Sequence, residues 1–401
     1  MIGMTDRACQ TRLTRRAFMA AAAAVGAGAS LGGPRPLAAQ EPVDQPAPAP
    51  PVPVIDTTDL YHPHQDVGDN FDLIAAYALP EVDLRAVILD VTEEYRRPTS
   101  GDGIARDPGI IPVCQLNSIF GRSVPYATAP FQRMRSIHDP MLDAPAPQQA
   151  GVRLLLETLD RSDQPVNITV FGSARPVAVA YNREPDLMRT KTRMIHLCAG
   201  ATEPGYVEWN AALDPHAFVR LLRSDLPIAY YPCATADGPF AYGEHNCFWL
   251  LPDLRFVRRM DPRLQSYLAY AFTRSTRPDF LCAMDEPATE EALASFVTRP
   301  HNVWETGIWA TIARRCVARD AEGHFRLLKE NEIPQPGTEL PNELLPCRLE
   351  ALDDGQVRVQ LTDEATTTSI YYRGDPRAHE AALREALPAL YTSFQTGPTP
   401  S

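Results

Sequence analysis

Residues 52–89 read VPVIDTTDLYHPHQDVGDNFDLIAAYALPEVDLRAVIL, and this stretch decides the fold. A β-branched run at 52–55 and a second apolar run at 84–89 each have the length of a strand. Between them, apolar residues recur at helical spacing after Asp69. They are Phe71, Ile74, Ala75, Ala78 and Leu79. The stretch therefore predicts a β-α-β unit with parallel strands and a right-handed crossover.

The same alternation continues along the chain. The further strand-like runs are 124–127, 166–171, 194–198 and 227–231, and the helical segments between them are 150–159, 176–181 and 215–222. Two later segments, 254–296 and 303–316, look mainly helical. We therefore predict an α/β fold, a doubly wound and mainly parallel sheet flanked by helices.

Near the C-terminus the pattern changes. Runs at 347–352 and 356–361 flank an Asp-Gly turn and predict a β-hairpin. A third strand at 368–373 and a closing helix at 377–391 follow. We expect residues 341–396 to form a small hairpin-and-helix extension of the main domain, which spans 54–340. Covering a pocket and contacting another subunit are equally compatible with this extension.

The first 40 residues have the features of an export signal. Arg15 and Arg16 form a twin arginine, residues 20–29 are small and apolar, and 36–40 offer a cleavage site. The apolar run is too short to span a bilayer well. We expect a twin-arginine signal peptide (1–40), a Pro/Ala-rich linker (41–53), and a periplasmic or secreted protein without stable membrane insertion. An uncleaved, tethered form is the alternative.

The net charge argues against certain partners, and the cysteine spacing argues against certain structural sites. The formal net charge of −12 argues against nucleic acids and anionic membrane surfaces. Seven of the eight cysteines follow the signal, widely spaced and without a CxxC motif. This spacing fits neither a disulfide scaffold nor a zinc site. We expect the cysteines to act as small, buried apolar side chains. Oxidation of one pair in the periplasm is left open.

Five aspartates lie within residues 56–72, at the carboxyl end of the first strand and the start of its helix. Ligands of open α/β sheets bind at that edge. Such close carboxylates repel one another unless a proton or a cation neutralises them, and oxygen donors suit Ca²⁺ before Mg²⁺. Alternatively, Asp69 and Asp72 only cap the helix. His62 and His64 are equally compatible with substrate contact and with solvent exposure.

Four segments in chain order carry a resemblance to a known family. They are the Asp-x-x-Asp strand end followed by DVGDNFDLIA (66–75), PVNITVFGSARPVA (165–178), MIHLCAG (194–200), and EWN with DPHA (208–217). These segments resemble the motifs of the inosine–uridine-type nucleoside hydrolases, whose first motif is DTDPGxDDAxAL. The likeness spans residues 52–235, with weaker agreement to 316.

The resemblance implies a Ca²⁺-dependent hydrolase that cleaves the N-glycosidic bond of nucleosides or related ribosides with an activated water. The general base would be Asp59 or Asp66, a choice that the lengthened loop leaves open. Glu208 and Asn210 would hydrogen-bond the sugar. The Ca²⁺ ligands would be Asp59, Asp69, Asp72 and Glu305.

Two further features bear on substrate and activity. His245 and Asn246 lie in a polar segment flanked by aromatic residues, which predicts part of the leaving-group pocket or, alternatively, a helix cap. Arg175 stands opposite a threonine whose carbonyl ligates Ca²⁺ in the family, and a cation there would compete with the metal.

The departure at Arg175 keeps two other functions open. One is an exported, non-catalytic protein that binds a sugar or nucleoside on the same fold. The other is a hydrolase of another glycoside class. In each case the expected partner is a small-molecule nucleoside or glycoside. The family's tendency to form dimers or tetramers leaves a homo-oligomer open as well.

Overall fold

The predicted β-α-β unit is present. Strand β1 (Val52–Thr58) leads to helix α1 (Val67–Ala78) and then to strand β2 (Val82–Leu89), which pairs with β1 in parallel. β1 extends beyond the predicted run, because its β-branched Thr57 and Thr58 continue the pairing. Asp56 therefore lies within the strand, and Asp59 follows its end.

The computed structural model describes residues 50–60, 67–95, 107–304 and 306–397. These residues form one compact unit that begins at Pro50. The predicted signal peptide and most of the predicted linker lie outside them. Among the described helices, none combines the length and the apolar character needed to cross a membrane.

Within the described residues, β1 and β2 belong to a sheet of nine strands in the order β12-β11-β13-β6-β5-β4-β1-β2-β3. Pairing is parallel from β13 across to β3. The remaining strands of the predicted alternation are β3 (Tyr126–Thr128), β4 (Val166–Val170), β5 (Thr192–Cys198) and β6 (Ile228–Tyr231). Because these strands are parallel, their carboxyl ends share one edge of the sheet.

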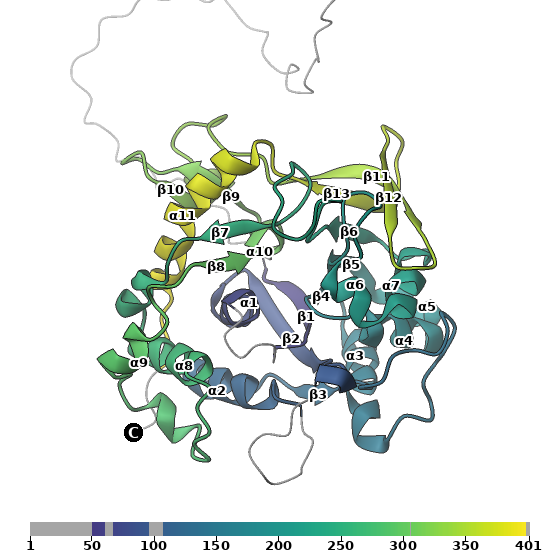
Figure 1. Cartoon of the computed structure of the whole chain (residues 1–401), viewed down its shortest axis with the longest axis horizontal. Helices are drawn as coiled ribbons and strands as arrows, with labels where there is room; N and C mark the ends of the chain where they lie inside the picture. Colours follow the sequence, from purple (N-terminus) through teal and green to yellow (C-terminus); the bar gives the residue numbers. More distant parts are fainter. Residues whose placement is uncertain (1–49, 61–66, 96–106, 305, 398–401) are drawn as a thin grey trace, which may run out of the picture. The chain divides into compact units, whose positions relative to one another are not determined.

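Helices cover both faces of the sheet, with α1 on one side of the central strands and α3 and α4 on the other (Figure 1). Val54 and Ile55 belong to different apolar clusters, since neighbouring strand residues point to opposite faces. The first cluster includes residues of α1, α2 (Ile110–Phe120), α8 (Pro262–Phe272) and α10 (Thr306–Ala313). The second includes residues of α3 (Ala150–Arg161), α4 (Arg175–Arg183) and α7 (Pro215–Leu222). The α/β fold prediction is confirmed by this mainly parallel sheet with helices on both faces.

The predicted C-terminal hairpin is formed by β11 (Glu343–Ala351) and β12 (Val357–Leu361). It does not stand apart from the sheet. Strand β13 (Thr368–Tyr372) pairs in parallel with β6 on one side and antiparallel with β11 on the other. Helix α11 (Pro376–Ser393) closes the chain, and Tyr391 OH donates a hydrogen bond of 2.7 Å to Phe71 O of α1.

The two segments expected to be mainly helical, 254–296 and 303–316, contain α8 and α10 as predicted. Four short strands at or beyond the ends of these segments were not predicted. They are β7 (Trp249–Leu251), β8 (His301–Val303), β9 (Arg315–Arg319) and β10 (Phe325–Lys329), paired as β7–β8 and β9–β10. Three further α-helices are short, α5 (Pro185–Lys191), α6 (Trp209–Leu213) and α9 (Glu290–Ala294). Of the seven described cysteines, only four are buried as expected; Cys114 and Cys316 are half-buried and Cys282 is exposed.

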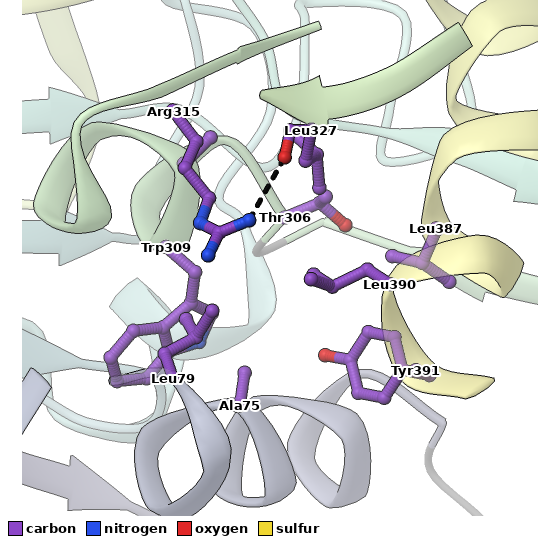
Figure 2. Close-up of a pocket in the computed structure, with 10 residues that line it drawn as sticks. Ala75, Leu79, Thr306, Trp309, Arg315, Leu327, Leu387, Leu390 and Tyr391 are labelled. Atoms are coloured by element: carbon purple, nitrogen blue, oxygen red, sulfur yellow. Dashed lines mark hydrogen bonds between the residues drawn. The ribbon is translucent and has the colours of Figure 1, made fainter. Parts of the chain in front are cut away.

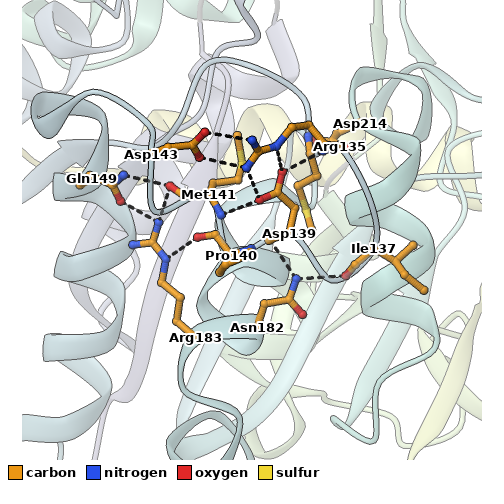
Figure 3. Close-up of polar contacts among 11 residues, drawn as sticks. Arg135, Ile137, Asp139, Pro140, Met141, Asp143, Gln149, Asn182, Arg183 and Asp214 are labelled. Carbon is orange, nitrogen blue, oxygen red and sulfur yellow. Dashed lines mark hydrogen bonds and ion pairs between the residues drawn. The ribbon is translucent and has the colours of Figure 1, made fainter.

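A long connection between β3 and α3 is fastened to α4 by polar contacts (Figure 3). Arg183 Nε donates to Pro140 O at 2.7 Å, and Asn182 Nδ2 donates to Ile137 O at 3.0 Å. Within the connection, Arg135 Nε pairs with Asp139 Oδ2 at 2.7 Å. These contacts fasten the connection to α4.

Candidate functional site at the carboxyl edge of the sheet

Three loops converge where β1, β2 and β4 end. The residues that follow these strands include Asp59, Asp90 and Gly172. A Cβ atom placed on Gly172 would lie 2.7 Å from Asp90 Oδ1 and 3.0 Å from Asp59 Cβ. Both acidic side chains therefore approach the same glycine, and only a residue without a side chain leaves room for them.

Asp90 is the acidic residue that the sequence analysis missed. Its side chain is completely buried, and Ser173 Oγ donates a 2.6 Å hydrogen bond to Oδ2. Oδ1 has no hydrogen-bond partner among the described residues. Burial raises the pKa of Asp90 to about 6, although nearby Arg175 and the Ser173 hydrogen bond act in the opposite direction. Its position directly after the second predicted strand was the signal that would have identified it.

Asp56 is a second buried carboxyl group near this edge. It lies within β1, where Thr169 Oγ1 donates a 2.6 Å hydrogen bond to its Oδ1. Its Oδ2 has no hydrogen-bond partner in the described part of the chain. Burial raises the pKa of Asp56 to about 7, and the negative charge of Asp90 contributes in the same direction. Asp90 therefore lies near both Asp56 and Asp59, and we call these three buried residues the carboxylate group; Asp59 is 6 % exposed.

Arg175, the residue that departs from the family motif, is completely buried. Its guanidinium donates to Pro130 O at 2.6 Å and to Asp90 O at 2.8 Å, and it pairs with Asp214 Oδ2 at 3.5 Å. Asp214 also caps α7 by accepting from Ala217 N. The cation is therefore held by carbonyl oxygens and by Asp214, close enough to Asp90 to counteract part of the rise that burial causes in the pKa of that carboxyl group.

Of the other predicted metal ligands, two lie in α1 and one lies outside the described residues. Asp69 and Asp72 are buried in α1, and Trp309 Nε1 of α10 donates a 2.8 Å hydrogen bond to Asp72 Oδ1. Asp66, Glu305, His62 and His64 lie outside the described residues. Among the residues that are described, no three His, Cys, Asp or Glu side chains are grouped closely enough to hold a metal ion.

Glu208 and Asn210, the predicted sugar contacts, make hydrogen bonds within the chain. Glu208 caps α6, and its carboxylate accepts from Gly200 N at 2.7 Å and from Asn210 N at 3.0 Å. Asn210 Nδ2 donates to Cys198 O at 2.9 Å. Burial raises the pKa of Glu208 to about 7, against the effect of the backbone N–H donors. Both residues hold the loop after β5 at the same edge as the carboxylate group.

His245 and Asn246 lie in the loop between β6 and β7. The Nδ1 atom of His245 is 2.9 Å from Tyr371 O. Asn246 is completely buried; its Oδ1 accepts from Gly243 N at 2.8 Å, and its Nδ2 donates to Ala241 O at 2.8 Å. The amide of Asn246 thus stabilises the loop, whereas the half-buried His245 ring keeps part of its surface exposed.

A small apolar pocket lies elsewhere, between α1, α10, β10 and α11 (Figure 2). It is lined mainly by apolar side chains, including Leu79, Trp309 and Leu390. Arg315 at this pocket donates to Leu327 O at 3.0 Å. The carboxylate group of Asp56, Asp59 and Asp90 does not line it, so we assign the candidate site to the carboxyl edge.

Comparisons of sequence find no relative. No protein-family model matches the chain, and no curated protein matches it. Comparison with solved structures does find proteins of similar fold. A plant nucleoside hydrolase has a TM-score of 0.50 at 15 % identity, covering 85 % of this chain and 100 % of that one. The effector protein XOO4466 has a TM-score of 0.50 at 15 % identity, covering 86 % and 94 %.

A third similar structure is the inosine–uridine preferring nucleoside hydrolase from Bacillus anthracis, with a TM-score of 0.42 and 14 % identity over 83 % of this chain and 97 % of that one. At these identities the similarity concerns the fold. Four motifs in register predicted such a fold, and the architecture agrees with them. The chain therefore has the fold of the nucleoside hydrolases.

Proposed function

We propose that this protein is a hydrolase that cleaves the N-glycosidic bond of nucleosides or related ribosides. The observation that carries the proposal is the convergence of Asp59 and Asp90 on Gly172 at the carboxyl edge of the sheet. The fold is shared with a plant nucleoside hydrolase, and ligands of open α/β sheets bind at this edge.

In the proposed reaction, a water oxygen bonds to C1′ while the bond between C1′ and the base nitrogen breaks. A carboxylate, Asp59 or the predicted alternative Asp66, accepts a proton from the water. The proton taken from the water ends on the departing base nitrogen, so ribose and free base are the products and the carboxylate is regenerated. The sugar passes through an oxocarbenium-like state, and the buried negative charge of Asp59 and Asp90 stabilises this positive charge.

Asp90 offers one donor of the kind that suits the Ca²⁺ implied by the resemblance. Asp90 Oδ1 is a buried carboxyl oxygen without a hydrogen bond from the described residues, and carboxylate oxygens are the donors that Ca²⁺ prefers. Asp59 and Asp90 would hold the ion, with the predicted ligands Asp69, Asp72 and Glu305 as further candidates. A bound Ca²⁺ would neutralise the carboxylates and acidify a water molecule.

The test is a hydrolysis screen of nucleosides and other glycosides with the full-length chain. We expect Asp59→Asn and Asp90→Asn each to lower kcat/KM at least about 100-fold, the scale of losing a catalytic carboxylate or its charge. Asp163→Asn, an exposed residue far along the chain, is the matched control. Removal of Ca²⁺ by EDTA should abolish turnover, and added Ca²⁺ should restore it. A wild type that cleaves no riboside would contradict the proposal.

A second candidate function is a non-catalytic binding protein. It is favoured by Arg175, the departure from the family motif, because its buried guanidinium lies beside Asp90 and would compete with a bound cation. Calorimetry separates the two functions, because nucleoside binding without the release of free base supports the binding protein. Release of ribose together with base supports the hydrolase.

We further propose that the protein acts outside the cytoplasm, on the strength of Arg15 and Arg16 in the basic region. Replacing both with lysine should retain the protein in the cytoplasm, as measured by immunoblots of periplasmic and cytoplasmic fractions. Equal periplasmic amounts of the variant and the wild type would contradict the export route.

A further inference from the structure

Arg373 directly follows β13 and is 1 % exposed. Its guanidinium donates to Gly243 O at 3.0 Å, Phe248 O at 2.6 Å and Asn246 Oδ1 at 2.8 Å. Its main-chain N–H donates to Glu244 O at 2.9 Å. Four hydrogen bonds from one residue therefore reach the same stretch, which we name the 240–248 loop.

Other residues of the C-terminal region hold the same loop. Tyr242 OH donates a 2.5 Å hydrogen bond to Glu380 Oε2 of α11, and the Arg377 guanidinium carbon lies 3.5 Å from the centre of the Tyr242 ring. The His245 ring contacts Tyr371 O, as described above. The conformation of the loop is therefore set by residues more than 120 positions later in the chain.

The 240–248 loop belongs to the edge that carries the candidate site. It follows β6, the neighbour of β5, whose following loop contains Glu208. Ala236 N, just before the loop, donates to Glu203 Oε1 at 3.3 Å, which joins the two loops. Phe240 is 59 % exposed, and its ring centroid lies 6.2 Å from that of Trp304.

We propose that Arg373 is a positioning residue that sets leaving-group selectivity by fixing the 240–248 loop, with Phe240 and His245 as the side chains it presents. The inference rests on the proposed function of the site. Its physical basis is the planar guanidinium, which satisfies three acceptors at once in fixed directions. A lysine at this position supplies one ammonium group that cannot match the same three acceptors.

The inference is tested by comparing substrates that have the same sugar but differ in the leaving group. The substrates are inosine, uridine and 4-nitrophenyl riboside, which share ribose and differ in the leaving group. We expect Arg373→Lys to raise KM for the two nucleosides at least about tenfold, with kcat changed less than about threefold, the behaviour of lost substrate binding. Inhibition by free ribose should be unchanged.

Two further variants distinguish a change in substrate preference from a general loss of folding. Phe240→Ala removes an exposed ring and should change the preference among the three substrates in the same direction as Arg373→Lys. Arg183→Lys is the matched control, since Arg183 also donates to carbonyl oxygens of one segment, Pro140 O and Met141 O, away from the site. It should lower stability without changing the preference.

An equal loss of kcat/KM for all three substrates in Arg373→Lys would overturn the inference, as would an unchanged preference in Phe240→Ala. If the wild type cleaves none of them, the proposed function fails, and the Kd values of nucleosides and of ribose, measured by calorimetry, replace KM as the readout. A selective loss of nucleoside affinity would then still support the role of Arg373. A wild type that binds no nucleoside contradicts both proposals.

Discussion

Gly172 shows how a single backbone position shapes the candidate site. Its neighbours Asp59 and Asp90 approach from the ends of two different strands, and Ser173 orients one of the two carboxyl groups. Since a buried carboxylate is costly unless it is compensated, the close approach is expected where the group binds a ligand or exchanges a proton.

We predict that Gly172→Ala lowers kcat/KM at least about tenfold, because a 1 Å misplacement of reacting groups is costly. The added methyl group would lie 2.7 Å from Asp90 Oδ1, closer than van der Waals contact allows. Steady-state kinetics measures the loss. Gly121→Ala is the control; it has a φ of +59° but open space around its Cβ, so it should cost about 1 kcal/mol of stability and leave activity intact.

His196 is a buried histidine in β5, with Nε2 3.2 Å from Asn167 Oδ1 and Nδ1 3.4 Å from Tyr231 OH. Burial lowers its pKa to about 3. As the pH falls below 6.5, the unfolded chain takes up a proton at this residue and the folded chain does not. Stability is therefore lost as the pH falls from 6.5 towards 3, by up to about 1.4 kcal/mol per pH unit.

The measurement is the free energy of unfolding from denaturant titrations between pH 7 and pH 4. In His196→Gln, the free energy of unfolding should decline less steeply with falling pH, because about one proton fewer is taken up on unfolding. His216→Gln, the same change at an exposed residue of α7, is the control for the substitution itself. Identical slopes for wild type and His196→Gln would refute the assignment.

At the level of elements, α1 is fixed between the sheet and two later helices. Trp309 of α10 donates to Asp72, and Tyr391 of α11 donates to Phe71 O. The Phe71 and Tyr391 rings also meet edge to face, with centroids 4.6 Å apart. Hydrogen bonds to buried carboxylates contribute more than those between neutral groups, so these contacts hold the acidic start of α1 in place.

Trp309→Phe should lower the free energy of unfolding by about 1–2 kcal/mol, because it removes the donor to Asp72 and keeps most of the ring packing. Thermal and denaturant unfolding measure this loss. Trp209→Phe is the control at a tryptophan that is 42 % exposed. Comparable effects of the two changes would show that the hydrogen bond to Asp72 contributes little.

For the whole molecule, the C-terminal region completes the sheet. β13 covers the edge of β6 and carries the hairpin β11–β12 beyond it. An uncovered β6 would present unpaired backbone groups, a common cause of aggregation. The buried side chains of Tyr371, Leu383 and Tyr391 also belong to the core that α1 shares.

A chain that ends at Asn342 should therefore fail to give a cooperative thermal transition, and most of it should be insoluble. A chain that begins at Pro50 should melt like the full-length protein, because the compact unit starts there. Differential scanning calorimetry and soluble yield test both expectations. A soluble, cooperatively melting chain ending at Asn342 would show that the C-terminal region is dispensable for folding.

The sequence alone predicted the fold to a large extent. Apolar periodicity changes between strand and helix at the right places, and the Asp-Gly hairpin was recognised, because these patterns depend on neighbours within a few residues. The sequence also located Asp59 at the strand end where ligands bind. The extended β1 and the short strands β7 to β10 were missed, since pairing with distant partners decides them.

Only the tertiary structure decided which polar groups meet. Asp90 joins Asp59 because β2 and β4 both flank β1, an arrangement that local sequence patterns do not specify. Likewise, Asn246 Oδ1 accepts a hydrogen bond from Arg373, which lies 127 residues later in the chain. Periodicity reports which face of an element is buried, whereas the partners of a buried polar group depend on strand order. The sequence therefore determined the sheet and its acidic edge, and the strand order determined which acids share a site and what holds the loops around them.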